Sequence, residues 1–291
     1  CASANLQLFE RATFRENYLS KHMSAESATP PVIVKKPYQV IAPHGATRVD
    51  DYYWLRDDSR QDPEMLAVLN AENAYADSIL ASSKPLAETF YTEIIGRIKQ
   101  DDASVPYFKH GYWYYSRFET GKDYAIIEQQ KTNMDSLEEI LFEQNIMAAG
   151  KGYFSIGDWQ ISPNNQMVAW AEDSVGRRQY QLFVKDLATG KTFSDVVENI
   201  EANIVWADDN QTLFYIEKDP ITLLSKRVKS HVLGDANHLD NLVYEEADDS
   251  FYMGISRTRS EQYICITVES TVSSEQHFAL ANNPTKFTVI A

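Results

Sequence analysis

A strand pattern that recurs about every fifty residues limits what this chain can fold into more than any other feature. Short apolar strands start at Met167, Leu213 and Tyr263, which lie 46 and 50 residues apart. A strand-like segment precedes each of them, a third follows, and polar turns separate the three. Several short strands per unit with a period near fifty are typical of β-propeller blades. The sequence therefore predicts blades over residues 105–291, the first opening with a hairpin of residues 107–117 and 124–130 around Gly121-Lys122.

A β-sandwich with accidentally regular spacing is the alternative fold for this segment. The 17 Tyr, 13 Phe and 5 Trp of the chain favour β-structure in either case, because rings pack well across a pleated sheet. Roughly four units can be counted, and the chain stops inside a strand-like segment at residues 287–291. A ring closed on four units is uncommon. We therefore expect a mainly β fold, a partial propeller that belongs to a longer protein.

Residues 37–104 are predicted to form an extended arm followed by two helices. Prolines and a glycine between residues 37 and 58 favour an extended chain. Asp62 followed by Pro63 is typical of a helix start, and Pro85 is expected to begin the second helix. Apolar side chains recur at helical spacing and form a stripe on each helix. The mainly apolar stripe of the first helix consists of Leu66, Leu69, Asn73, Ala76 and Leu80, and that of the second of Leu86, Phe90, Ile94 and Ile98. Both stripes need an apolar partner, and no neighbouring segment offers one.

The first 36 residues are predicted to be a disordered leader. Met23 is the first methionine, and a polar segment containing Pro30 and Pro31 follows it. We interpret Met23 as the true start, which goes with a cytoplasmic location. The alternative is that Cys1 is the lipid-bearing first residue of a processed lipoprotein, which implies a lipid-anchored or periplasmic protein.

Cysteine use and hydropathy fit the cytoplasmic interpretation. The two cysteines, Cys1 and Cys265, form neither a disulfide framework nor a zinc motif. Cys265 lies in an apolar strand-like run and is expected to be a small buried hydrophobe. No stretch of about 18 apolar residues occurs, so we expect no membrane span.

The chain is strongly acidic, with a net charge of −15. Such a surface repels phosphate backbones, so nucleic acid is not an expected partner. It attracts cationic ligands, including short basic peptides. The simplest interpretation of the charge remains a well-solvated surface.

The run DYYWLRDD at residues 51–58 resembles the signature found near the amino terminus of prolyl oligopeptidases, in the form typical of oligopeptidase B. The resemblance covers nearly all of residues 37–291. Its other segments are Glu72-Asn73 and residues 93–98, 105–107, 111–112, 171–173, 177–180, 219–224 and 243–249.

This resemblance implies a two-part fold and a peptidase activity. In the family, a seven-bladed propeller covers a carboxy-terminal α/β-hydrolase domain that carries a Ser, Asp and His triad. The parent protein is expected to cleave short peptides after Arg or Lys without a cofactor, with the propeller restricting substrate size. The hydrolase domain, absent from this chain, is then the expected partner of the arm and helices in residues 37–104.

The chain itself is predicted to lack catalytic, metal and cofactor sites. No serine has glycine on both sides in the Gly-x-Ser-x-Gly pattern that a hydrolase nucleophile needs. The six histidines are interpreted as surface or structural residues. His238 and Asp240 would make a metal pair without a third ligand. Acidic doublets such as Asp57-Asp58 and Asp208-Asp209 are interpreted as turn and cap residues, because they lack calcium-loop spacing.

One basic pair carries a hypothesis about a domain contact. Arg177 and Arg178 follow Asp173 in an expected loop between strands. In the parent fold this loop could face the hydrolase domain and pair with its carboxylates. The alternative is a solvated surface pair.

A second class of function stays open at this point. The chain could be a stand-alone propeller that binds or scaffolds without catalysis. A reading frame with a glycine-rich elbow after Ala291 would support the peptidase, and a stop codon there would support the binding module.

Overall fold

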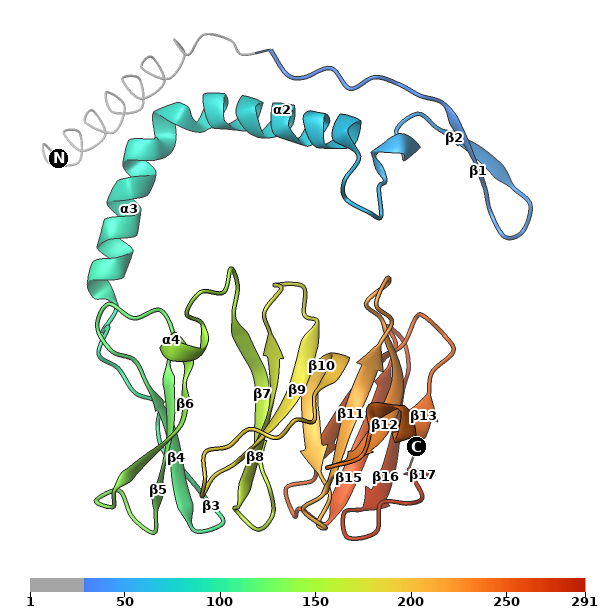
Figure 1. Cartoon of the computed structure of the whole chain (residues 1–291). Helices are drawn as coiled ribbons and strands as arrows, with labels where there is room; N and C mark the ends of the chain where they lie inside the picture. Colours follow the sequence, from blue (N-terminus) through green and yellow to red (C-terminus); the bar gives the residue numbers. More distant parts are fainter. Residues whose placement is uncertain (1–28, 291) are drawn as a thin grey trace, which may run out of the picture. The chain divides into compact units, whose positions relative to one another are not determined.

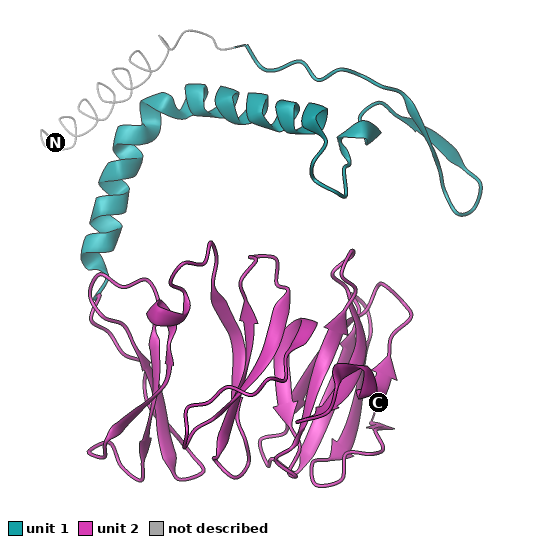
Figure 2. Cartoon of the chain, viewed as in Figure 1, with its two compact units in different colours: residues 1–99 teal, residues 100–291 magenta. Residues whose placement is uncertain are grey.

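The structure is a computed structural model that describes residues 29–290. The chain forms two compact units, divided between Lys99 and Gln100 (Figure 2). Among the described residues, no helix combines the length and apolar character needed to cross a bilayer. The predictions made for residues 1–28, including a start at Met23 and a lipid-bearing Cys1, lie outside the described residues.

The arm in the first unit contains a small hairpin. Strands β1 (Tyr38–Ile41) and β2 (Thr47–Asp50) pair antiparallel, and the 3-10 helix η1 (Tyr53–Leu55) follows. The rings of Tyr38 and Tyr53 stack at 4.2 Å between centroids. The Trp54 indole donates to the Val34 carbonyl at 3.0 Å. Local aromatic contacts therefore order an arm whose sequence indicated only an extended chain.

Two helices follow the arm, joined by one 3-10 turn. Helix α2 (Pro63–Leu80) leads through η2 (Ala81–Ser83) into α3 (Lys84–Arg97), which begins one residue before Pro85 (Figure 1). The Asp62 carboxylate accepts from the backbone N–H groups of Glu64 and Met65 at 2.9 and 2.8 Å. It therefore satisfies two of the donors that a helix start leaves unpaired, which confirms Asp62 as the N-cap.

The apolar stripes of these helices are open to solvent. Met65 is the only buried residue of α2, and α3 has none. Exposed fractions reach 50% for Leu69, 54% for Phe90 and 58% for Ile94. Within their own unit, the described residues therefore leave the stripes uncovered.

The second unit consists of four antiparallel blades. Blade 1 is the sheet of β3 (Tyr107–Lys109), β4 (Tyr112–Arg117), β5 (Ile126–Lys131) and β6 (Glu138–Glu143), followed by α4 (Gln144–Met147). Blade 4 is the sheet of β14 (Tyr252–Arg257), β15 (Tyr263–Glu269), β16 (Ser274–Leu280) and β17 (Thr288–Val289). Between them a seven-stranded sheet runs in chain order through β7 (Ser155–Ile161), β8 (Met167–Asp173), β9 (Tyr180–Asp186), β10 (Val197–Trp206), β11 (Thr212–Lys218), β12 (Ser225–Val232) and β13 (Asn241–Glu245). The 3-10 helix η3 (Asn237–Leu239) precedes β13.

The seven-stranded sheet is two blades that share β10. Near its start β10 pairs with β9, where Val197 lies opposite Leu182. Its end pairs with β11, where Trp206 lies opposite Leu213, and the register shifts between Ile200 and Ile204. Blade 2 is therefore β7–β9 with the start of β10, and blade 3 is the end of β10 with β11–β13. All four blades are four-stranded and follow one another in chain order (Figure 1). Their first strands line one cavity. This arrangement confirms a partial propeller and excludes the sandwich.

The predicted strand at residues 107–117 is broken by a turn. His110 and Gly111 both have positive φ angles, 48° and 86°, and Lys109 pairs with Tyr112. Two such residues form the type I′ turn that suits the twist of a hairpin. Residues 107–109 and 112–117 are therefore two separate strands.

Each core cluster is shared by neighbouring blades. Phe142 of blade 1 packs edge-on against Trp159 and Trp170 of blade 2, at 6.1 and 5.4 Å between centroids. Ile216 of blade 3 and Ile264 of blade 4, both fully buried, belong to one cluster. Burying such a side chain stabilises a fold by about 1.5–3 kcal/mol, so side-chain packing holds blade to blade.

Cys265 departs from its predicted burial. It lies on β15 between the fully buried Ile264 and Ile266 but is only half-buried, because alternate residues of a strand point to opposite faces. Partial burial raises the pKa of its thiol.

Candidate functional site

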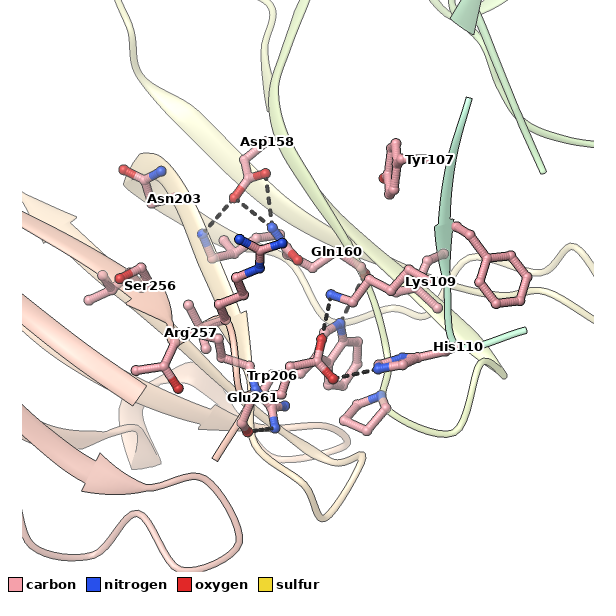
Figure 3. A pocket seen from close by; sticks show the side chains of 18 residues that line it. Tyr107, Lys109, His110, Asp158, Gln160, Asn203, Trp206, Ser256, Arg257 and Glu261 are labelled. Carbon is pink, nitrogen blue, oxygen red and sulfur yellow. Dashed lines mark hydrogen bonds and ion pairs between the residues drawn. The ribbon is translucent and has the colours of Figure 1, made fainter. Parts of the chain in front are cut away.

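Residues from all four blades line a cavity of about 660 Å³. Figure 3 shows the side chains around it. The first strand of each blade contributes to its wall: β3, β7, the end of β10 and β14. The turns after β3, β7 and β14 complete the lining. The volume lies within the range of small-ligand sites.

Asp158 links two blades at the cavity wall. Its carboxylate accepts a hydrogen bond from the backbone N–H of Trp159, the next residue, at 2.8 Å. It accepts a second from the backbone N–H of Ile204 in blade 3 at 3.3 Å. The Gln160 amide donates to the same carboxylate at 3.2 Å. Burial is the main influence and raises the pKa of Asp158, while these hydrogen bonds work against the rise.

A charged contact connects blade 1 with blade 4 across the cavity. Lys109 Nζ lies 2.9 Å from Glu261 Oε1, and the His110 ring hydrogen-bonds to Glu261 Oε2 (Figure 3). Burial raises the pKa of Glu261, but the hydrogen bonds from Lys109 and His110 outweigh it and leave that pKa below its usual value. The carboxylate is therefore ionised at neutral pH.

Arg257 ties the same region to blade 3. Its guanidinium donates to the Trp206 carbonyl at 3.2 Å and to Asp208 Oδ1 at 2.5 Å. It also donates to the backbone carbonyl of Glu261 at 2.5 Å. Carboxylates, an amide and cationic groups thus line this space and offer both hydrogen-bond donors and acceptors.

The hydrogen bonds in the described part of the chain include none between a serine hydroxyl and a histidine ring. Such a pair is what activates a serine nucleophile. No three potential metal ligands gather among residues 29–290.

Arg177 and Arg178 lie away from the cavity, in the loop between β8 and β9. Both are exposed, and neither forms an ion pair with any residue in the range 29–290. The Asp173 carboxylate shapes this loop, accepting from the backbone N–H groups of Val175, Gly176 and Arg178 at 2.8–2.9 Å. A contact between the two arginines and a hydrolase domain stays a prediction.

His238 and Asp240 do not pair. Asp240 instead accepts from the ring of His231 at 2.7 Å and from the Tyr215 hydroxyl at 2.7 Å. The second ring nitrogen of His231 lies 3.3 Å from Asp195. The interpretation of acidic doublets as turn and cap residues is confirmed where Asp57 and Asp209 accept from backbone N–H groups two to five residues later.

The cavity residues were not singled out from the sequence. From the sequence, His110 is one of six isolated histidines, Glu261 is only part of a polar turn between strands, and nothing distinguishes Asp158 or Arg257. The blade period holds one signal that could point to a cavity residue. Asn165, Asn210 and Glu261 occupy equivalent turns 45 and 51 residues apart, and Glu261 breaks the repeat of asparagine at this position.

The fold and cavity together define a β-propeller domain with polar groups around its axis. The model of the prolyl oligopeptidase N-terminal β-propeller domain matches residues 31–291. The chain belongs to the prolyl oligopeptidase family.

Two curated relatives resemble the chain in sequence. Dipeptidyl aminopeptidase BI of Pseudoxanthomonas mexicana is 54% identical over 92% of this chain, and protease 2 of Moraxella lacunata is 30% identical over 83%. The chain spans 39% and 36% of their lengths.

Solved structures agree with this assignment. Oligopeptidase B of Leishmania major superposes with a TM-score of 0.82 at 29% identity, over 91% of this chain and 40% of that one. Oligopeptidase B of Trypanosoma brucei gives a TM-score of 0.80 at 27% identity, over 90% and 39%.

Proposed function

We propose that this chain is the propeller part of a serine peptidase that hydrolyses short peptides after Arg or Lys. The propeller limits the size of the peptide that reaches the active site, and the triad lies outside this chain. The observation that carries the proposal is the 54% identity to a dipeptidyl aminopeptidase over 92% of the chain. The superposition on two structures of oligopeptidase B supports an oligopeptidase. Cleavage after Arg or Lys rests on the resemblance of residues 51–58 to that group.

Release of dipeptides is the second candidate activity. The relative at 54% identity is named a dipeptidyl aminopeptidase, whereas the oligopeptidases B are 29% and 27% identical. A substrate with a free amino group two residues before the scissile bond would then be preferred over the same substrate with a blocked amino group. An endopeptidase would instead cleave the substrate with the blocked amino group equally well or better.

A chimera tests both candidates. The chain replaces the matching segment of the Pseudoxanthomonas relative, and the purified chimera is assayed on Arg-containing chromogenic dipeptides with free or blocked amino termini. We expect turnover by the chimera and none by the chain alone. Turnover by the chain alone, sensitive to a serine-directed inhibitor, would overturn the assignment of catalysis to another segment.

The same proteins test the size limit and the binding-module alternative. The chimera should cleave a short Arg-containing peptide and leave an unfolded protein of several hundred residues intact. A chain that binds basic peptides tightly by itself, with an inactive chimera, would favour a stand-alone binding module. The acidic surface and the net charge of −15 support basic peptides as ligands in either case. We also propose a cytoplasmic location, because the two cysteines of the sequence form no disulfide framework.

A further inference from the structure

The turns that follow the first strand of each blade meet at one end of the cavity. The side chain of Asn165, in the turn of blade 2, donates to the His110 carbonyl of blade 1 at 2.9 Å. The backbone N–H of Asn164 donates to Asn210 of blade 3 at 2.8 Å. Neighbouring blades are therefore joined through their turns.

The remaining two contacts close this set into a circuit. Arg257 at the end of β14 binds Asp208 in the turn of blade 3. Glu261 in the turn of blade 4 binds Lys109 and His110 of blade 1. His110 and Glu261 lie 151 residues apart in the sequence. The last contact joins blades that are not neighbours in the chain, so it crosses the end of the cavity (Figure 3).

Glu261 holds an unfavourable backbone conformation. Its φ is 60°, and the equivalent residues Asn165 and Asn210 have φ of 58° and 59°. Asparagine tolerates this left-handed region well, whereas a glutamate there is uncommon. The turn geometry alone favours asparagine in blade 4 as well. An unfavourable backbone angle is retained where the side chain has a role that the surroundings fix.

We propose that Glu261 is a clasp that closes one end of the central cavity by holding the turn of blade 1 against the turn of blade 4. Asparagine is shorter by one carbon and uncharged, so it fits the turn but cannot form the contact. The side chains of Lys109, His110 and Glu261 are 43%, 33% and 30% exposed. Salt ions can therefore reach these charges and weaken their attraction. Access to the cavity from this end is therefore sensitive to ionic strength.

The reactivity of a thiol inside the cavity tests the clasp. Ser256 lines the cavity on β14, and Ser256→Cys in the full chain provides the probe. Its rate of reaction with a bulky maleimide is measured by peptide mapping, which separates this position from Cys1 and Cys265. Adding Glu261→Gln or Glu261→Asn is expected to raise the rate roughly two- to fivefold at low salt, the range for a partly exposed ion pair. Exchanging the charges, with Lys109→Glu and Glu261→Lys, should bring the rate back down.

A matched control and a salt series complete the experiment. Glu269→Gln removes an exposed carboxylate from the same blade and should leave the rate unchanged. Raising sodium chloride to about 0.5 M should accelerate labelling when Glu261 is present and not in its variants. The salt series on the Ser256→Cys chain needs no change to the clasp, so it still decides the question if a variant does not fold. Equal rates with and without Glu261 at both salt concentrations, or an equal rise in the Glu269→Gln control, would overturn the proposal.

Discussion

The indole N–H of Trp206 donates a 3.0 Å hydrogen bond to the backbone carbonyl of Gln160, which lies 46 residues earlier on the first strand of the preceding blade. Arg257, 51 residues after Trp206, donates to the Trp206 carbonyl at 3.2 Å. Side chains near the ends of the first strands of blades 3 and 4 thus bind the backbone of the blade before. The sequence period is therefore also the period of the contacts that join the blades.

Removing the Trp206 hydrogen bond should weaken the blade 2–blade 3 junction. Trp206 is 2% exposed, so Trp206→Phe leaves the Gln160 carbonyl without this donor in a buried place. We expect the free energy of unfolding to fall by about 1–3 kcal/mol, measured by urea denaturation. Trp113→Phe is the control, because the Trp113 indole donates to the Thr132 carbonyl at an exposed site. Similar losses in the two variants would contradict a special role for the buried bond.

The ring of His231 lies between two carboxylates and is almost fully buried. Nδ1 is 2.7 Å from Asp240 and Nε2 is 3.3 Å from Asp195. Both nitrogens can donate only in the protonated ring. The hydrogen bond to Asp240 is the main cause that raises the pKa of His231, opposed by burial.

This cluster predicts a pH-dependent stability. Because the folded-state pKa of His231 is raised above an unfolded value of about 6.5, its contribution is complete below that pH and is lost as the pH rises through the folded-state pKa. His231→Gln should therefore lower the free energy of unfolding more at pH 6 than at pH 9. His238→Gln, at an exposed histidine seven residues later, should show no such difference. A loss that is the same at both pH values would argue against the charged ring.

Local signals in the sequence predicted what depends on local structure. Asp62-Pro63 specified the start of α2, because an N-cap acts within three residues. The fifty-residue period predicted the blades, since each repeats the same strands and turns. The break at His110-Gly111 was missed because the apolar and aromatic pattern continues through it on both sides. A histidine–glycine pair is a weaker turn signal than asparagine–glycine.

The contacts that shape the cavity could not be predicted in this way. The partners of Glu261 lie about 150 residues earlier and meet it only through the curvature of four successive blades. The sharing of β10 by two blades likewise depends on a register shift between Ile200 and Ile204 that tertiary pairing imposes. Periodicity fixes which positions are equivalent, but not which of them touch.

The loop of Arg177 and Arg178 is predicted to matter for a domain contact and not for the stability of the blades. Both side chains are exposed, so replacing the pair by alanine should change the free energy of unfolding of the chain by less than about 0.5 kcal/mol. Asp173→Ala should cost about 2 kcal/mol, because its buried carboxylate accepts three backbone N–H groups. In the chimera with the Pseudoxanthomonas relative, the double arginine variant is expected to lower the thermal midpoint. An unchanged midpoint there would support the solvated surface pair.

Helices α2 and α3 are predicted to be the least stable regular elements of the chain by itself. They bury one side chain, Met65, whereas Ile264 and Ile266 on β15 are fully buried. A short helix without packing is marginal in water, so amides 63–97 should exchange hydrogen faster than those of the blade strands. Ile94→Ala should change the free energy of unfolding by less than about 0.5 kcal/mol, and Ile264→Ala should cost about 2–5 kcal/mol. Equal protection of the helices and the blade strands, in a chain shown to be monomeric by sedimentation, would mean that residues of this chain cover the stripes. The helices would then not need the hydrolase domain that the family resemblance implies as their partner.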